Sequence, residues 1–192
     1  MNNAAIYQDE NAIISEIING KEVLMSPRPA TKHAITAGNI HRIFSNFLRG
    51  KRCKTFFEPD LFLDENNNFV PDIVIVCDRD KIKYNGIYGA PDLVVEVLSA
   101  STAARDKGIK KAAYEKAGVK EYWIVDPVSK SIEVYHLQNG RLELVDVYLV
   151  YPEEEWERMT EEQRAAARLT VKVSLYDDLF VDVREVFEDI DL

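Results

Sequence analysis

The amino-acid sequence predicts an α/β protein, more closely an α+β mixed sheet flanked by helices. Three observations support this class. Short apolar runs bounded by turn residues are typical of strands, whereas two longer segments have helical spacing. Asn19-Gly20 between two short runs is a strong signal for a β-hairpin. The order of a helix, several strands, a helix and further strands indicates helices packed on a mixed sheet.

The bulk composition indicates one domain. The chain has 192 residues, 46% of them hydrophobic and 30% charged, which suits a single core over residues 1–192. No apolar run approaches the roughly 20 residues that cross a bilayer, and the first residues lack the pattern of a secretory signal. Cys53 and Cys77 form no Cys-x-x-Cys pair, which favours reduced thiols, a cytoplasmic protein and no zinc site.

Each element of the first half follows from local pattern. The segment from about Lys32 to Arg49 has apolar residues at three- and four-residue spacing, and Gly50 ends it, so we expect a helix. Asp64–Asn68 is a polar turn, and Asp78–Ala90 is polar and glycine-containing, which predicts a loop. The expected strands are Ile13–Ile18, Glu22–Met25, Lys54–Leu63, Ile73–Cys77 and Leu93–Leu98.

The second half continues the pattern with a second helix over Ala103–Ala117, for which Gly118 is the stop signal. A variable, acidic helical segment is expected at about residues 151–168, with its helix over Glu153–Arg168, and a short helix or turn over Val183–Phe187. The expected strands are Glu121–Val125, Ile132–Leu137, Leu142–Val150 and Leu169–Val173.

The negative charge is concentrated at the C-terminus. The chain carries a formal charge of −9, but residues 151–192 hold 13 acidic and 5 basic residues, so the remainder is nearly neutral. Two basic segments, His41–Lys54 and Ala103–Lys120, therefore offer candidate phosphate contacts on a nearly neutral body. For each segment alone, a solvated basic helix face is the favoured interpretation.

Asp72 and Glu96 are the candidate metal ligands. Glu96 interrupts a strand that is otherwise apolar on both faces, and a buried carboxylate needs a cation, a hydrogen-bond partner or a raised pKa. Asp72 begins the preceding buried strand, so the two side chains can share one magnesium ion. The alternative is that Glu96 pairs with a lysine and serves only the structure.

Lys110 is the candidate for that cation or for an assisting catalytic group. Asp106, Lys110 and Tyr114 are spaced by four and share one helix face, whereas Ile109 is expected on the buried side with its apolar neighbours. This places Lys110 near the sheet. A lysine there could orient an attacking hydroxide and stabilise transition-state charge. The alternative is an ordinary helix pair with Asp106.

Other polar residues have weaker cases. His33 begins the first helix, where a capping or packing role is favoured over assistance in catalysis. Ser99 and Ser101 are expected to cap the next helix rather than act as nucleophiles. Asp92 lies four residues before Glu96, roughly 13 Å away along a strand, which is too far for one shared metal ion.

The motifs together resemble the Uma-two family of restriction-endonuclease-like proteins in the PD-(D/E)XK nuclease superfamily. The resemblance rests on Val70–Val76, on Pro91–Ser99 and on Arg105–Lys110 followed by Tyr114 and Ala117–Pro127. It implies a restriction-endonuclease-like core and a magnesium-dependent phosphodiesterase site, with manganese as an alternative metal.

In this resemblance Asp72 and Glu96 match the two metal-binding acids, and Lys110 matches a helical lysine of the family. The superfamily places a lysine two residues after the second acid, where this chain has Leu98. The resemblance also implies DNA as the partner and a homodimer, because two strands need two cuts. The alternatives are an inactive nuclease-fold module that binds nucleic acid or protein, and a purely structural ion pair.

Overall fold

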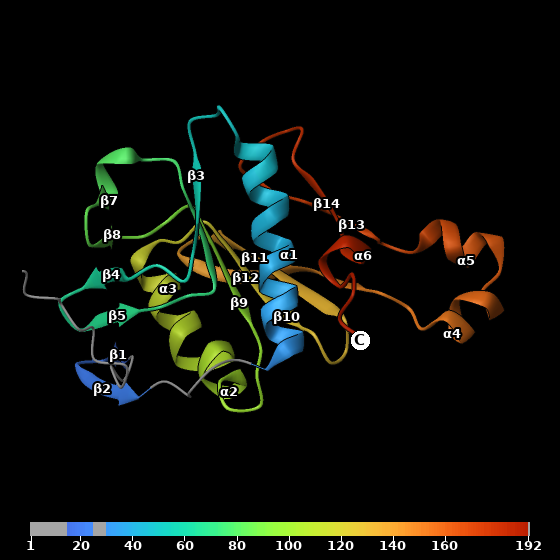
Figure 1. The fold of residues 1–192 in the computed structure, drawn as a ribbon, viewed down its shortest axis with the longest axis horizontal. Coiled ribbons are helices and arrows are strands. Elements are labelled where there is room, and N and C mark those ends of the chain that lie inside the picture. Colours follow the sequence, from blue (N-terminus) through green and yellow to red (C-terminus); the bar gives the residue numbers. More distant parts are fainter. Residues whose placement is uncertain (1–14, 25–29, 192) are drawn as a thin grey trace, which may run out of the picture.

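The computed structural model describes residues 15–24 and 30–191. Its centre is a six-stranded mixed sheet with the order β12-β11-β10-β9-β6-β3 (Figure 1). β9 runs parallel to β10 and antiparallel to β6, so the sheet is mixed as the sequence predicts. Its strands are β3 (Lys54–Phe57), β6 (Ile73–Val76), β9 (Leu93–Val97), β10 (Glu121–Asp126), β11 (Ser131–Gln138) and β12 (Arg141–Leu149).

The middle of this sheet is covered on both faces, which explains its continuous apolar strands. Every residue of β6 and β9 is buried. Leu93, Val95 and Val97 of β9 pack on the side of α1 (Thr31–Leu48), together with the C-terminal elements. Val94 of the same strand joins a second core with Tyr114. The alternation of side chains along β9 therefore places Glu96 on the second face.

A second sheet and the α2–η2–α3 segment cover that second face. The sheet has the order β2-β1-β5-β4-β8-β7. Its strands are β1 (Ser15–Ile18), β2 (Lys21–Leu24), β4 (Leu61–Asp64), β5 (Asn67–Phe69), β7 (Ile82–Lys83) and β8 (Gly86–Tyr88). The helical segment consists of α2 (Ala103–Arg105), the π-helical turn η2 (Asp106–Lys110) and α3 (Lys111–Ala117).

The predicted N-terminal hairpin is present as β1 and β2. Asn19 and Gly20 both have positive φ, at 51° and 74°, as a turn that joins two antiparallel strands requires. The predicted strands began at Ile13 and ended at Met25, and these end residues lie outside the described part of the chain.

Two sequence predictions between the first helix and β9 are wrong in detail. The expected strand over Lys54–Leu63 is two strands in different sheets, because Glu58 adopts a positive φ of 45° and turns the chain. The expected loop over Asp78–Ala90 contains η1 (Arg79–Lys81), β7 and β8. Gly86 permits this hairpin, since a Cβ there would lie 2.6 Å from the Asp60 carbonyl oxygen.

In the C-terminal region the predicted acidic helical segment is wrong in detail. The helix expected over Glu153–Arg168 is two short helices, α4 (Glu153–Arg158) and α5 (Glu161–Ala166), that project from the body (Figure 1). Thr160 separates them because it forms a capping box with Gln163. The chain then returns through β13 (Thr170–Lys172), β14 (Phe180–Asp182) and α6 (Val183–Val186), which pack near α1.

The prediction of two reduced thiols is also wrong. Cys53 and Cys77 form a disulfide, with their Cα atoms 3.9 Å apart. The pairing of Lys54 with Val76 in the antiparallel β3–β6 ladder brings the two cysteines opposite each other, although 24 residues separate them in the chain. Among the described helices, none is long and apolar enough to cross a membrane.

Candidate active site

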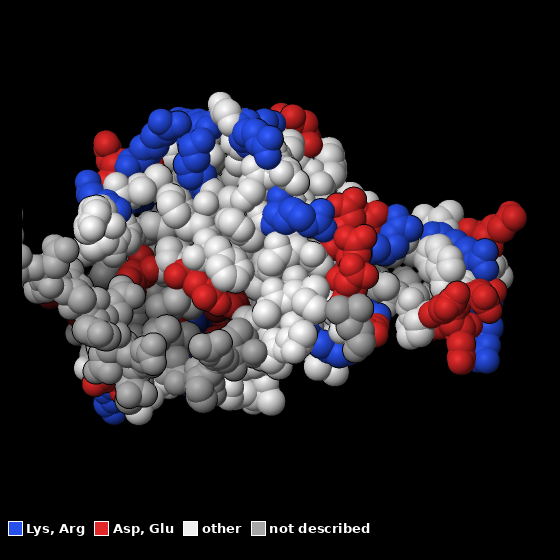
Figure 2. All heavy atoms as spheres, in the orientation of Figure 1, with Lys and Arg blue, Asp and Glu red and all other residues white. Residues whose placement is uncertain are grey.

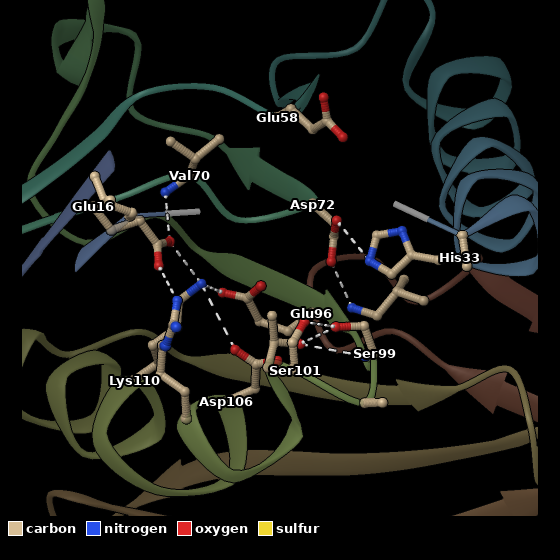
Figure 3. A pocket seen from close by; sticks show the side chains of 16 residues that line it. Glu16, His33, Glu58, Val70, Asp72, Glu96, Ser99, Ser101, Asp106 and Lys110 are labelled. Atoms are coloured by element: carbon tan, nitrogen blue, oxygen red, sulfur yellow. Dashed lines mark hydrogen bonds and ion pairs between the residues drawn. The ribbon is translucent and has the colours of Figure 1, made fainter. Parts of the chain in front are cut away.

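A pocket of about 370 Å³ opens where the two sheets and the start of the helical segment meet (Figure 3). Its charged and polar lining comes from seven elements or their adjoining turns, several of which lie far apart in the sequence. The lining residues that bear on its chemistry are Glu16, His33, Glu58, Asp72, Glu96, Ser99, Ser101, Arg105, Asp106 and Lys110.

Asp72 and Glu96 belong to two neighbouring strands, at positions that the register places opposite each other. The antiparallel register pairs Ile73 with Val95, so one step further along the ladder Asp72 lies opposite Glu96. Residues opposite each other in such a ladder point to the same face. The Asp72 carboxylate accepts a hydrogen bond of 2.7 Å from the Val97 N–H, and its other oxygen lies 3.3 Å from His33 Nε2.

Glu96 is held by two donors from the helical segment. Its Oε1 atom accepts a hydrogen bond of 2.6 Å from the Tyr114 hydroxyl and lies 2.7 Å from Lys110 Nζ. Burial raises the pKa of Glu96 well above its ordinary value, and the carboxylates of Asp106 and Asp72 add to the rise. A further cation at this carboxylate would therefore favour its ionised form.

Lys110 is surrounded by carboxylates. Its Nζ atom lies 2.7 Å from Glu96 Oε1, 2.9 Å from Glu16 Oε1 and 3.8 Å from Asp106 Oδ1. Burial alone would lower the pKa of this ammonium, but the three carboxylates raise it above its ordinary value. Lys110 is therefore a buried, charged lysine at the inner wall of the pocket.

The helical face that carries Lys110 is the buried one. Asp106, Lys110 and Tyr114 are all buried at four-residue spacing, whereas Ile109 is 50% exposed. The sequence prediction that Ile109 marks the buried side is wrong. These three polar side chains can be buried because charged and hydroxyl groups pair with them. A pattern of apolar residues alone does not reveal such pairing.

Glu16 and Arg105 are site residues that sequence reasoning missed. Glu16 is 1% exposed, and its two oxygens contact Lys110 and Arg105. Its signal was available, because Glu16 lies two residues before the apolar Ile18 and so shares the inward face of β1. Like Glu96, Glu16 is a carboxylate at an inward-facing strand position, and such a group needs a cation or a hydrogen-bond partner.

His33 and Glu58 lie on the outer side of Asp72. Burial lowers the pKa of His33, but the hydrogen bond and charge of Asp72 outweigh it and raise the pKa overall. For Glu58, burial raises the pKa, and the charge of Asp72 raises it further. His33 thus contacts Asp72 directly, beyond the capping or packing role that the sequence favours.

Of the remaining residues singled out from the sequence, the two serines line the pocket, whereas Asp92 and Leu98 lie elsewhere. Ser99 and Ser101 line the pocket and contact each other through their hydroxyls at 3.1 Å, and Ser99 also contacts Thr102 at the start of α2. Asp92 does not line this pocket, since it accepts hydrogen bonds from the Cys77 N–H and from Lys120. Leu98 is buried in the second core.

The donor set of the pocket fits a magnesium ion that is held largely by water. Within residues 15–24 and 30–191, no group of three or more His, Cys, Asp or Glu side chains could hold a metal ion. Magnesium commonly uses one or two carboxylates and keeps several waters. Asp72 and Glu96 supply two such carboxylates, and the pocket of about 370 Å³ has room for water around them.

The two basic segments lie in different parts of the structure. Figure 2 shows Lys and Arg side chains gathered along the upper edge of the molecule, over the end of α1, the start of β3 and η1. The first segment contributes Arg49, Lys51, Arg52 and Lys54 to these elements. Cations of both segments also form ion pairs within the chain, as in Lys51–Asp178 of the first segment and Lys107–Glu133 and Lys120–Asp92 of the second.

The fold and the paired strands that bring two acidic residues into one pocket define a restriction-endonuclease-like α+β protein. A solved structure from Anabaena variabilis, described as "a putative nuclease belonging to DUF820", matches with a TM-score of 0.68 and 22% identity over 90% of this chain and 89% of that chain. The chain belongs to the Uma2 family, whose model, described as "Putative restriction endonuclease", matches residues 4–172.

Two curated relatives come from Synechocystis sp., and both are described as uncharacterized. One is 32% identical over 108 residues, which are 54% of this chain and 56% of that protein. The other is 27% identical over 133 residues, which are 66% of this chain and 74% of that protein. The chain therefore matches little more than half the length of the first relative.

Proposed function

We propose that this protein is a magnesium-dependent endonuclease that hydrolyses phosphodiester bonds in DNA. The observation that carries the proposal is the placement of Asp72 opposite Glu96 in a pocket, with Lys110 2.7 Å from Glu96. The family and the solved neighbour, both described in terms of nucleases, support a nuclease-like function. The metal and the substrate class are our own inference.

The charge of the pocket supports a bound divalent cation. Four buried carboxylates, those of Glu16, Asp72, Glu96 and Asp106, gather around two cations, Lys110 and Arg105. With all four carboxylates ionised and His33 neutral, this set would carry two excess negative charges, which a divalent cation would balance. Asp72 and Glu96 would hold that ion, which supplies a water of lowered pKa and neutralises charge on a phosphate.

Lys110 would stabilise negative charge on the reacting phosphate. Its ammonium lies beside Glu96 at the wall of the pocket, and a preoriented cation there needs no rearrangement as charge develops. In the superfamily that the sequence resembles, the lysine stands two residues after the second acid, where this chain has Leu98. We propose that Lys110 takes that role from the neighbouring helix.

His33 would orient Asp72. The Nε2 atom of His33 lies 3.3 Å from Asp72 Oδ1, and the Val97 N–H donates to the second oxygen at 2.7 Å. Two donors from different elements fix the plane of the carboxylate. Orientation of this kind supports a defined ligand geometry.

A second candidate is an inactive nuclease-fold module that binds nucleic acid or protein. It is favoured by Leu98 at the position of the superfamily lysine and by the three carboxylates that already surround Lys110. The two candidates differ in the expected result of a cleavage assay.

The test combines DNA cleavage with metal binding. Purified protein is incubated with supercoiled plasmid and with labelled duplex oligonucleotides in Mg²⁺, Mn²⁺ or EDTA. We expect cleavage in either metal and none in EDTA, with loss of cleavage in Asp72→Asn and Glu96→Gln. Asp92→Asn is the matched control, because this buried aspartate also follows a proline but lies outside the pocket.

Each outcome separates the candidates. A magnesium-induced rise in melting temperature that both pocket variants remove, without cleavage of any DNA, would support the inactive module. No magnesium effect on the wild type at millimolar concentrations, together with no cleavage, would contradict the endonuclease. We also expect a homodimer, since two strands require two cuts, and sedimentation measures it directly.

A further inference from the structure

Glu16 connects three separate parts of the pocket. Its Oε1 atom accepts a hydrogen bond of 3.0 Å from the Val70 N–H and lies 2.9 Å from Lys110 Nζ (Figure 3). Its Oε2 atom accepts a hydrogen bond of 3.2 Å from Arg105. Val70 lies two residues before Asp72, and Lys110 contacts Glu96. Glu16 therefore links the backbone next to Asp72 with the lysine beside Glu96.

The environment of Glu16 makes it an expensive residue to bury. Its side chain is 1% exposed, and three donors replace the hydrogen bonds to water that it loses on burial. A hydrocarbon side chain at this position would fit the apolar face of β1, where Ile18 is buried. The carboxylate is therefore better explained by what it holds than by packing.

Lys110 needs an acceptor besides Glu96. A lysine ammonium ends a flexible four-carbon chain, so acceptors on more than one side are needed to fix its position. In the proposed function Glu96 also binds a metal ion, which reduces its attraction for the lysine. Glu16 contacts Lys110 through the Oε1 atom that the Val70 N–H also holds, so it retains the ammonium when Glu96 is shared.

Arg105 completes this arrangement. It pairs with the second oxygen of Glu16, and its own side chain is 24% exposed at the pocket. This pairing offsets part of the negative charge that Glu16 brings to Lys110. We propose that Glu16 is a positioning residue that holds the Lys110 ammonium in place while Glu96 serves the metal, with Arg105 holding Glu16 in turn; the inference rests on the proposed function.

The first test reads the position of the lysine without any cleavage. In metal-free protein labelled with ¹⁵N at lysine Nζ, the buried Lys110 ammonium should give a slowly exchanging signal, assigned by its loss in Lys110→Met. We expect Glu16→Gln to broaden or remove this signal. Glu22→Gln is the matched control, since Glu22 is an exposed glutamate on the neighbouring strand β2, and it should leave the signal unchanged.

The second test separates positioning from simple stability. We expect Glu16→Gln to lower kcat for DNA cleavage by about 10–100-fold, as for other residues that orient a catalytic group, with KM and the Kd for Mg²⁺ within about twofold of wild type. Should Glu16→Gln fail to fold, Arg105→Ala replaces it in the ammonium measurement, with the same broadening expected.

The outcomes distinguish this inference from the proposed function. An unchanged Lys110 signal in folded Glu16→Gln, or in Arg105→Ala where that variant replaces it, would overturn the positioning role whether or not the wild type cleaves DNA. A wild type without cleavage but with a signal that depends on Glu16 would contradict the endonuclease and leave the positioning of Lys110 supported. Where the wild type cleaves DNA, an equal kcat in folded Glu16→Gln would also overturn the inference.

Discussion

Replacement of Lys110 by methionine should strongly destabilise the metal-free protein. The change keeps most of the hydrocarbon stem but removes the ammonium that lies 2.7 Å from Glu96 and 2.9 Å from Glu16. Removing one partner of a buried ion pair typically costs about 3–5 kcal/mol, because the remaining charges stay buried without compensation. For a chain of this size, that loss corresponds to a melting temperature lower by roughly 6–20 °C.

Urea denaturation in EDTA at pH 7 measures the loss, and Lys107→Met is the matched control. Lys107 lies in the same helical turn, but its side chain is 48% exposed in its ion pair with Glu133, so its removal should cost less than about 1 kcal/mol. At pH 5 the cost of Lys110→Met should shrink, because Glu96 can then be protonated more readily. A loss at pH 7 no larger than that of the control would contradict a stabilising role for the buried Lys110 ammonium.

Further predictions concern the fold and its dependence on pH. Gly86→Ala should lower the free energy of unfolding by about 1–3 kcal/mol, because φ is +146° and the new Cβ would lie 2.6 Å from the Asp60 carbonyl oxygen; urea denaturation tests this. Glu121→Ala should lower the free energy of unfolding by at least about 2 kcal/mol in the same assay. The change leaves the buried indole N–H of Trp123 and the backbone N–H of Ser174 without their acceptor. Trp156→Ala should change the free energy of unfolding by no more than about 0.5 kcal/mol, since α4 has no buried residue. Metal-free protein should lose stability as the pH rises above about 4.5, because the raised pKa of Glu96 lets the folded state keep a proton that the unfolded state releases. Glu96→Gln should flatten this decline, and an identical slope in this variant would contradict the assignment.

The placement of Asp72 and Glu96 could be predicted because it depends on the apolar pattern of the two strands to which they belong. Continuous apolar runs indicate central strands, and a single carboxylate inside such a run is conspicuous. The structure pairs these two strands directly, and the antiparallel register brings the acids opposite each other. Their role as metal ligands stays a prediction.

The rest of the pocket depends on contacts that no local pattern encodes. Glu16 reaches Lys110 because β1 belongs to the second sheet, which covers the helical segment. Ile109 was assigned to the buried side because apolar residues usually define it, but paired charges occupy that face instead. The Cys53–Cys77 disulfide depends on the β3–β6 register, which spacing in the sequence does not reveal.

The metal site at Asp72 and Glu96 is tested most directly by anomalous diffraction from crystals of the protein soaked in Mn²⁺. We predict a peak between the Asp72 and Glu96 carboxylates, with metal–oxygen distances of about 2.0–2.3 Å, and its loss in Glu96→Gln crystals soaked in the same way. A pocket without an anomalous peak in crystals that bind Mn²⁺ elsewhere, with Lys110 still contacting Glu96, would contradict this metal site.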